Sequence, residues 1–99
     1  MELQETVEMM NSNDYKERFK AEYYQLKIRT IKLASFLRKY KNNELDFAPK
    51  CSYEFLRMQW QTMINYMMIL ESRAKIEGIE LQIVKSNGMI FYCPEGGAL

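Results

Sequence analysis

The sequence predicts a mainly α-helical fold, an antiparallel hairpin of two long helices followed by a small C-terminal β-hairpin. Residues 14–43 and 52–77 each repeat apolar side chains at alternating spacings of three and four, which is typical of amphipathic helices. The segment between them contains Asn42, Asn43 and Pro49, residue types that end helices. After residue 78 the apolar period changes to two, the period of a β-strand.

The first helix is expected over residues 14–43. Asp14 is a good N-cap, and Glu17 stands three residues later, where a capping box places its carboxylate. A second apolar stripe, Tyr24, Ile28 and Ile31, lies on another face and needs a cover from the chain ends or from another chain. The main apolar positions form a heptad seam, namely Phe19, Tyr23, Leu26, Thr30, Leu33, Leu37 and Tyr40.

The second helix is expected over residues 52–77, with Ser52 as N-cap and Gly78 as the residue that ends it. This helix is apolar over most of its circumference between Trp60 and Leu70, which predicts burial on more than one side. We therefore expect a homodimer or higher oligomer in which the hairpins form a helical bundle. The apolar series facing the first helix is Tyr53, Leu56, Trp60, Met63, Met67, Leu70 and Ala74.

The β-hairpin is expected over residues 79–93, because Asn87-Gly88 between two β-prone runs favours a two-residue turn. The chain then divides into an N-terminal segment, 1–13, forming a short helix or a tail; one domain, 14–93; and a flexible tail, 94–99. The N-terminal segment contains acidic residues and no basic ones.

The composition argues against an enzyme. The 99 residues include no histidine and two cysteines, so neither a Ser–His nor a Cys–His nucleophile can form. Two cysteines without histidine also do not suit a structural zinc site. No run of 18 apolar residues suggests a membrane span. We expect no catalytic residue, no metal and no cofactor.

The first helix carries the candidate binding residues. Residues 14–43 hold nine Lys or Arg against three Asp or Glu, although the whole chain has a net charge of only +1. Basic side chains next to tyrosine can hold a phosphate and stack a base, and the residues predicted to do so are Tyr24, Lys27, Arg29 and Lys32. The alternative is that these bases are the solvated flank of an amphipathic helix. The long helices do not suit specific binding of duplex DNA.

The segments YKERFKAEYYQLKIRTIKLASFL, LDF and RAKIEGIEL, with the run 63–70, resemble small phage and prophage proteins of uncharacterised activity, including those of crAss-like phages. The resemblance covers about residues 14–81. It implies an accessory phage gene whose product acts in the host cytoplasm and counters host defence. One mechanism is sequestration of a cyclic nucleotide or related immune signal. The alternatives are an anti-CRISPR-type inhibitor that docks on a host defence effector, and an oligomeric phage regulator or scaffold.

Overall fold

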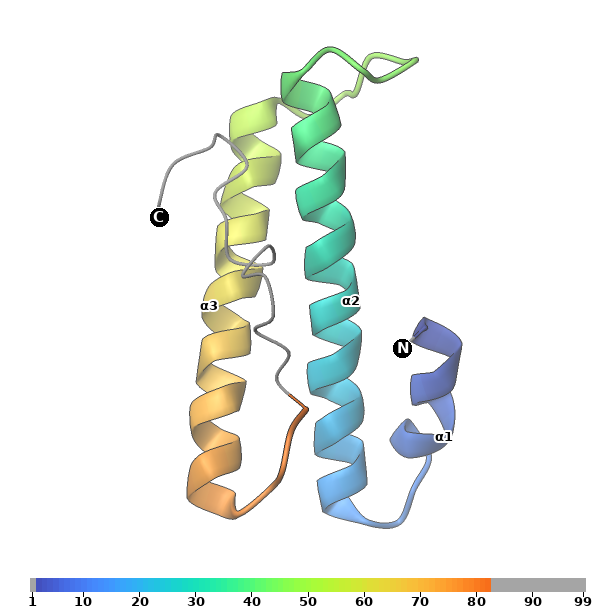
Figure 1. Cartoon of the computed structure of the whole chain (residues 1–99), viewed down its shortest axis with the longest axis vertical. Helices are drawn as coiled ribbons and strands as arrows, with labels where there is room; N and C mark the ends of the chain where they lie inside the picture. The colour runs from blue at the N-terminus through green and yellow to red at the C-terminus, as the bar shows by residue number, and fades with distance from the viewer. Residues whose placement is uncertain (1, 83–99) are drawn as a thin grey trace.

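The computed structural model describes residues 2–82 and has four helical elements. A short 3-10 helix, Leu3–Thr6, leads into α1, Val7–Met10, and the long helices are α2, Tyr15–Lys41, and α3, Tyr53–Glu77. Helices α2 and α3 run antiparallel, and the N-terminal segment lies on the side of α2 away from α3 (Figure 1). The predicted helical hairpin is confirmed.

The ends of the long helices follow the capping residues in the sequence. The Asp14 side chain accepts a hydrogen bond from the Lys16 N–H at 3.0 Å, and Ser52 accepts one from the Phe55 N–H at 3.1 Å. The predicted capping box is incomplete, because the Asp14 N–H donates to Ser12 Oγ. At the end of α3, Gly78 adopts φ 71°, a left-handed conformation that favours glycine.

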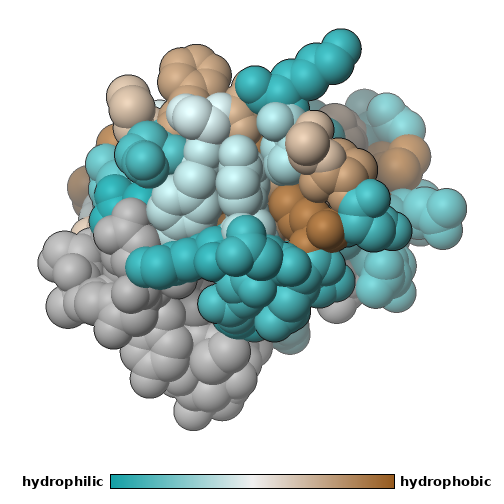
Figure 2. Space-filling view, turned by 90° about the horizontal axis from the view of Figure 1, so that it is seen from above, coloured by the Kyte–Doolittle hydropathy of each residue, from teal (hydrophilic) through white to brown (hydrophobic). Residues whose placement is uncertain are grey.

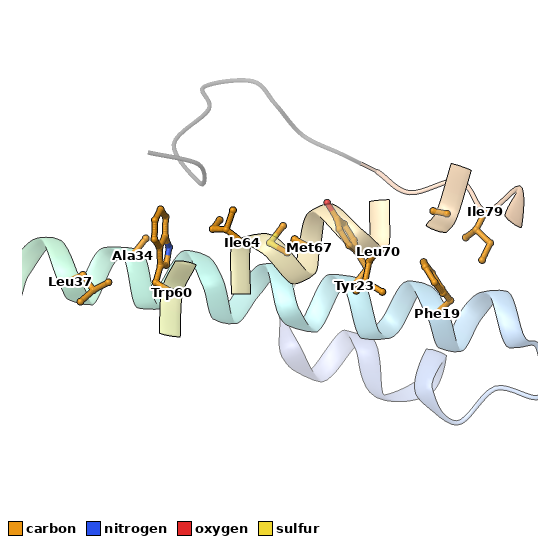
Figure 3. Packing of buried hydrophobic residues seen from close by; sticks show 10 residues of the cluster. Phe19, Tyr23, Ala34, Leu37, Trp60, Ile64, Met67, Leu70 and Ile79 are labelled. Atoms are coloured by element: carbon orange, nitrogen blue, oxygen red, sulfur yellow. The ribbon is translucent and has the colours of Figure 1, made fainter. Parts of the chain in front are cut away.

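The core lies between α2 and α3. Phe19, Tyr23 and Leu37 come from the predicted seam of α2 and meet Trp60 and Leu70 of α3, all with at most 3% of their surface exposed (Figure 3). The heptad positions therefore predicted the packed faces correctly. Tertiary packing also buries residues outside both predicted series, among them Ala34 and Ile64.

Two segments lie on or beside the second apolar stripe of α2. The N-terminal segment packs beside it, where Gln25 Nε2 donates to the buried Thr6 hydroxyl at 2.9 Å and Ala21 has no exposed surface. On the other side, Leu81 of the run after α3 packs with Tyr24 against the core. Ile31 keeps 46% of its surface exposed. The run after α3 thus contributes to the cover expected for this stripe, and the N-terminal segment covers the adjacent face of α2.

The described part of the chain contains no β-strand, so the predicted hairpin is not supported over residues 79–82. The physical reason is that two backbone N–H groups of this run donate to partners outside a strand pair. The Ile79 N–H donates to the Ala74 carbonyl at 2.8 Å, and the Gln82 N–H donates to the Tyr24 hydroxyl at 3.0 Å. The rest of the predicted hairpin and the predicted tail, 94–99, lie outside the described residues.

Between residues 2 and 82, no helix combines the length and apolar character needed to cross a membrane. The structure contains one copy of the chain, so the predicted association of helical hairpins into a larger bundle stays a prediction.

Candidate functional site

The predicted site residues separate into two groups on α2. Tyr24 and Lys27 are three residues apart and share one helical face. Both contact the backbone of Gln82: its N–H donates to the Tyr24 hydroxyl at 3.0 Å, and its carbonyl lies 3.5 Å from Lys27 Nζ. These two side chains therefore hold the run that follows α3 against the helical hairpin.

Tyr24 and Lys27 belong to an inner cluster with Tyr23 and Glu71. The Tyr23 hydroxyl donates to Glu71 Oε2 at 2.6 Å, and the two tyrosine rings pack edge to face with centroids 5.6 Å apart. Burial lowers the pKa of Lys27, and the nearby Glu71 carboxylate partly opposes this shift. Burial and the bond to Glu71 raise the pKa of Tyr23. The polar groups of the inner cluster thus engage one another and the chain's own backbone.

Arg29 and Lys32 lie on a different face. Arg29, Lys32, Phe36 and Lys39 follow one another at spacings of three, four and three, so they form one stripe along α2. Arg29, Lys32 and Lys39 are exposed and Phe36 is half-buried. We call these four residues the basic stripe. Because Lys27 is two residues from Arg29, its side chain points to nearly the opposite side of the helix.

The upper part of the basic stripe borders a hollow of about 450 Å³ at the connection between α2 and α3. We call it the loop-end hollow. Seen from this end, the molecule shows hydrophobic side chains grouped among hydrophilic ones (Figure 2). The residues that line the hollow are Lys32, Ser35, Phe36 and Lys39 of α2 and Glu44, Leu45, Asp46 and Phe47 of the connection.

The backbone of the connection is folded back on the end of α2. The Glu44 N–H donates to the Lys39 carbonyl at 2.9 Å, and the Asn43 N–H donates to the Tyr40 carbonyl at 3.2 Å. Asn43 has φ 57°, a left-handed conformation that asparagine tolerates better than most residues. This reversal brings the ring of Phe47 to that of Phe36, with centroids 6.2 Å apart and planes at 36°.

The loop-end hollow combines the chemical groups that a nucleotide needs. Lys32 and Lys39 make no ion pair with any described residue, so both ammonium groups are available to an anion. Phe47 keeps 57% of its surface exposed and offers an aromatic face. Ser35 and the carboxylates of the connection supply polar groups for a sugar or a base edge. A volume of this size suits a small-molecule ligand.

Sequence reasoning identified Lys32 but missed most of the hollow around it. Phe36 and Lys39 carried the signal of a shared helical face with Lys32, at spacings of four and seven. Leu45 and Phe47 alternate in the connection, a pattern that predicts packing across the end of the hairpin but does not indicate a hollow. The structure places Arg29 on the same stripe as Lys32, and Tyr24 with Lys27 in the inner cluster.

Comparison with known proteins gives one family. Searches of curated proteins and of solved structures return no significant match. The profile of the family described as Sequestin matches residues 13–76, which span α2, the connection and α3. This match covers well over half of the chain and includes every residue that lines the loop-end hollow. The chain therefore belongs to the Sequestin family.

Proposed function

We propose that this chain is a non-enzymatic binding protein that sequesters a phosphate-bearing nucleotide in the loop-end hollow. The observation that carries the proposal is the pairing of two ammonium groups, Lys32 and Lys39, with two aromatic rings around one hollow. The family name, which refers to sequestering, supports a binding role.

In the proposed complex, the phosphates bind Lys32 and Lys39, and the base packs on the exposed ring of Phe47. Lysine ammonium groups bind phosphates as point charges, and a base stacked on an aromatic side chain contributes about 1–3 kcal/mol. Glu44 and Asp46 face the same hollow and repel a bare anion. They therefore favour a ligand that also offers hydroxyl or amino donors, as a nucleotide does.

The biological role we propose is phage counter-defence. A phage protein that binds a cyclic nucleotide or an ADP-ribose-type immune signal keeps that signal from its receptor in the host cytoplasm. The resemblance to small phage proteins and the absence of a histidine nucleophile from the sequence support a binder over an enzyme. A protein inhibitor that docks on a host defence effector is the competing role.

The test is isothermal titration calorimetry and thermal shift with cyclic dinucleotides, cyclic trinucleotides and ADP-ribose-type compounds. A ligand at a hundred times its Kd stabilises the folded chain by about 2.7 kcal/mol, which is a shift of many degrees for a domain of this size. We expect one nucleotide class to bind, and Lys32→Glu and Lys39→Glu each to weaken it at least about tenfold. Lys16→Glu, a reversal on the exposed first turn of α2, is the matched control.

The inner cluster provides the discriminating variants. If the loop-end hollow is the site, Lys27→Met keeps binding, whereas Arg29→Glu weakens it moderately because Arg29 lies lower on the basic stripe. Loss of binding in Lys27→Met, with Lys32→Glu and Lys39→Glu unchanged, would place the ligand at Tyr24 and Lys27 instead. If no nucleotide class binds, the sequestration proposal fails, and co-purification of one host protein would then support the inhibitor role.

A further inference from the structure

The face of α3 that points away from α2 carries a regular pattern of exposed residues. Four of them are apolar and largely open to solvent, with exposed fractions between 57% for Ile69 and 84% for Ile76. The whole set of exposed residues repeats at spacings of three and four, which are the spacings of the a and d positions over three heptads of a coiled coil. We call this set the outer seam, and its members are Phe55, Met58, Thr62, Asn65, Ile69, Ser72 and Ile76.

Within the described chain, two side-chain hydrogen bonds of the outer seam stay inside α3: the Thr62 hydroxyl donates to the Met58 carbonyl, and Gln61 Nε2 donates to Asn65 Oδ1. The residues of α3 that are buried against α2 lie on its opposite side, for example Trp60, Met67 and Ala74. A helix with exposed apolar residues near both ends of a second face is typical of an interaction surface.

We propose that the outer seam binds the outer seam of a second copy of this chain, with the two α3 helices antiparallel. The pattern is self-complementary about a point near residue 64. With that point on the twofold axis, Met58 lies opposite Ile69 of the second copy, and Thr62 lies opposite Asn65. By symmetry, one Met58–Ile69 layer lies on each side of the centre, and Phe55 lies opposite Ser72 beyond it. In the centre, the Asn65 amide N–H can donate to the Thr62 hydroxyl of the second copy.

The flanking charges fix the orientation. Glu54 and Lys75 stand beside the two ends of the outer seam, and neither makes an ion pair with a described residue. In the antiparallel arrangement Glu54 lies beside Lys75 of the second copy, and symmetry repeats this pair. In a parallel arrangement the two residues stay about 32 Å apart along the axis, from 1.5 Å of rise per residue. Charge complementarity therefore favours the antiparallel dimer.

A seam of three heptads with a polar centre is short, so we expect a Kd on the order of micromolar. The proposal does not rest on nucleotide binding, because the loop-end hollow and the outer seam share no residue.

The test is sedimentation velocity of the full chain over a concentration series that reaches about 100 µM, far above the expected Kd. We expect dimer in the wild type and monomer in Ile69→Lys, with circular dichroism showing unchanged helicity, because Ile69 is exposed in the single chain. Ile31→Lys, the same change at an exposed isoleucine of α2, is the matched control and stays dimeric.

Charge reversal tests the orientation separately. Glu54→Lys and Lys75→Glu each place like charges together twice and raise the Kd about tenfold. The double variant restores both pairs and recovers the wild-type Kd. A wild type that is monomeric throughout the series overturns the proposal, and so does a dimer that Ile69→Lys leaves intact. If Ile69→Lys breaks the dimer but neither charge reversal changes its Kd, the antiparallel register is overturned.

Discussion

The Tyr23 hydroxyl donates a 2.6 Å hydrogen bond to the Glu71 carboxylate across the α2–α3 interface. Tyr23 has no exposed surface, and Glu71 is half-buried. This bond gives the carboxylate a partner inside an otherwise apolar interface, where an unpaired charge would cost stability. It also links the core to the inner cluster that holds Gln82.

Removing this bond lowers stability and changes its pH dependence. The pKa of Tyr23 is raised above its ordinary value of 10.0, so the folded state favours the neutral phenol. Its contribution is complete below pH 10 and is lost as the pH rises further. We expect Tyr23→Phe to lower the free energy of unfolding by about 1–3 kcal/mol at pH 7 and to weaken the alkaline loss of stability. Urea denaturation at pH 7 and pH 11 measures both effects. If Tyr23→Phe loses as much stability between the two pH values as the wild type does, Tyr23 is not the group responsible for the alkaline loss.

Lys27→Met leaves stability equal or increases it. Burial lowers the pKa of Lys27, so the charged form is less favourable in the folded chain than in the unfolded one, at every pH below its ordinary value of 10.5. Methionine keeps the apolar stem and removes that cost. Thermal unfolding at pH 7 checks this, with Lys16→Met on the exposed surface as control. A drop of several degrees in Tm specific to Lys27→Met shows that the 3.5 Å contact to the Gln82 carbonyl outweighs burial.

Trp60 is the largest fully buried side chain, so Trp60→Ala lowers the free energy of unfolding by about 3–5 kcal/mol. Its indole N–H has no hydrogen-bond partner among the described residues. Trp60→Phe removes that unsatisfied donor while keeping an aromatic ring, and therefore costs much less. Chemical denaturation of both variants measures the difference. Val7→Ala, at a side chain 49% exposed, sets the baseline for a surface truncation.

Gly78→Ala lowers the free energy of unfolding by about 1–2 kcal/mol, because a Cβ is unfavourable at φ 71°. No atom lies within 4 Å of the added Cβ, so the cost comes from the backbone alone. Gly78→Asn costs less, since asparagine tolerates the left-handed conformation. Urea denaturation compares the two variants, and equal losses in both would contradict a purely conformational cause.

The helical hairpin was predictable because its signals are local. Caps at Asp14, Ser52 and Gly78 mark helix ends within a few residues, and a repeat of three and four identifies the packed face of each helix. On α3 the same repeat placed Trp60, Met67 and Leu70 on the face that meets α2, and all three are buried in the core.

The loop-end hollow was beyond sequence reasoning. It exists because the left-handed turn at Asn43 folds the connection back so that Phe47 reaches Phe36. Only then does Lys32 border the same space as Asp46. The inner cluster could not be predicted from the sequence for the same reason. Gln82 reaches Tyr24 only after the chain leaves α3 and returns along α2.

The position of the N-terminal segment on α2 has a consequence for amide hydrogen exchange. Its contacts with α2, such as the bond from Gln25 to Thr6, lie on the side away from α3. This segment can therefore open and close while the core between α2 and α3 stays intact. We expect the amides of residues 3–10 to exchange with solvent well before those around Tyr23 and Met67, so that the chain behaves as two cooperative units of different stability.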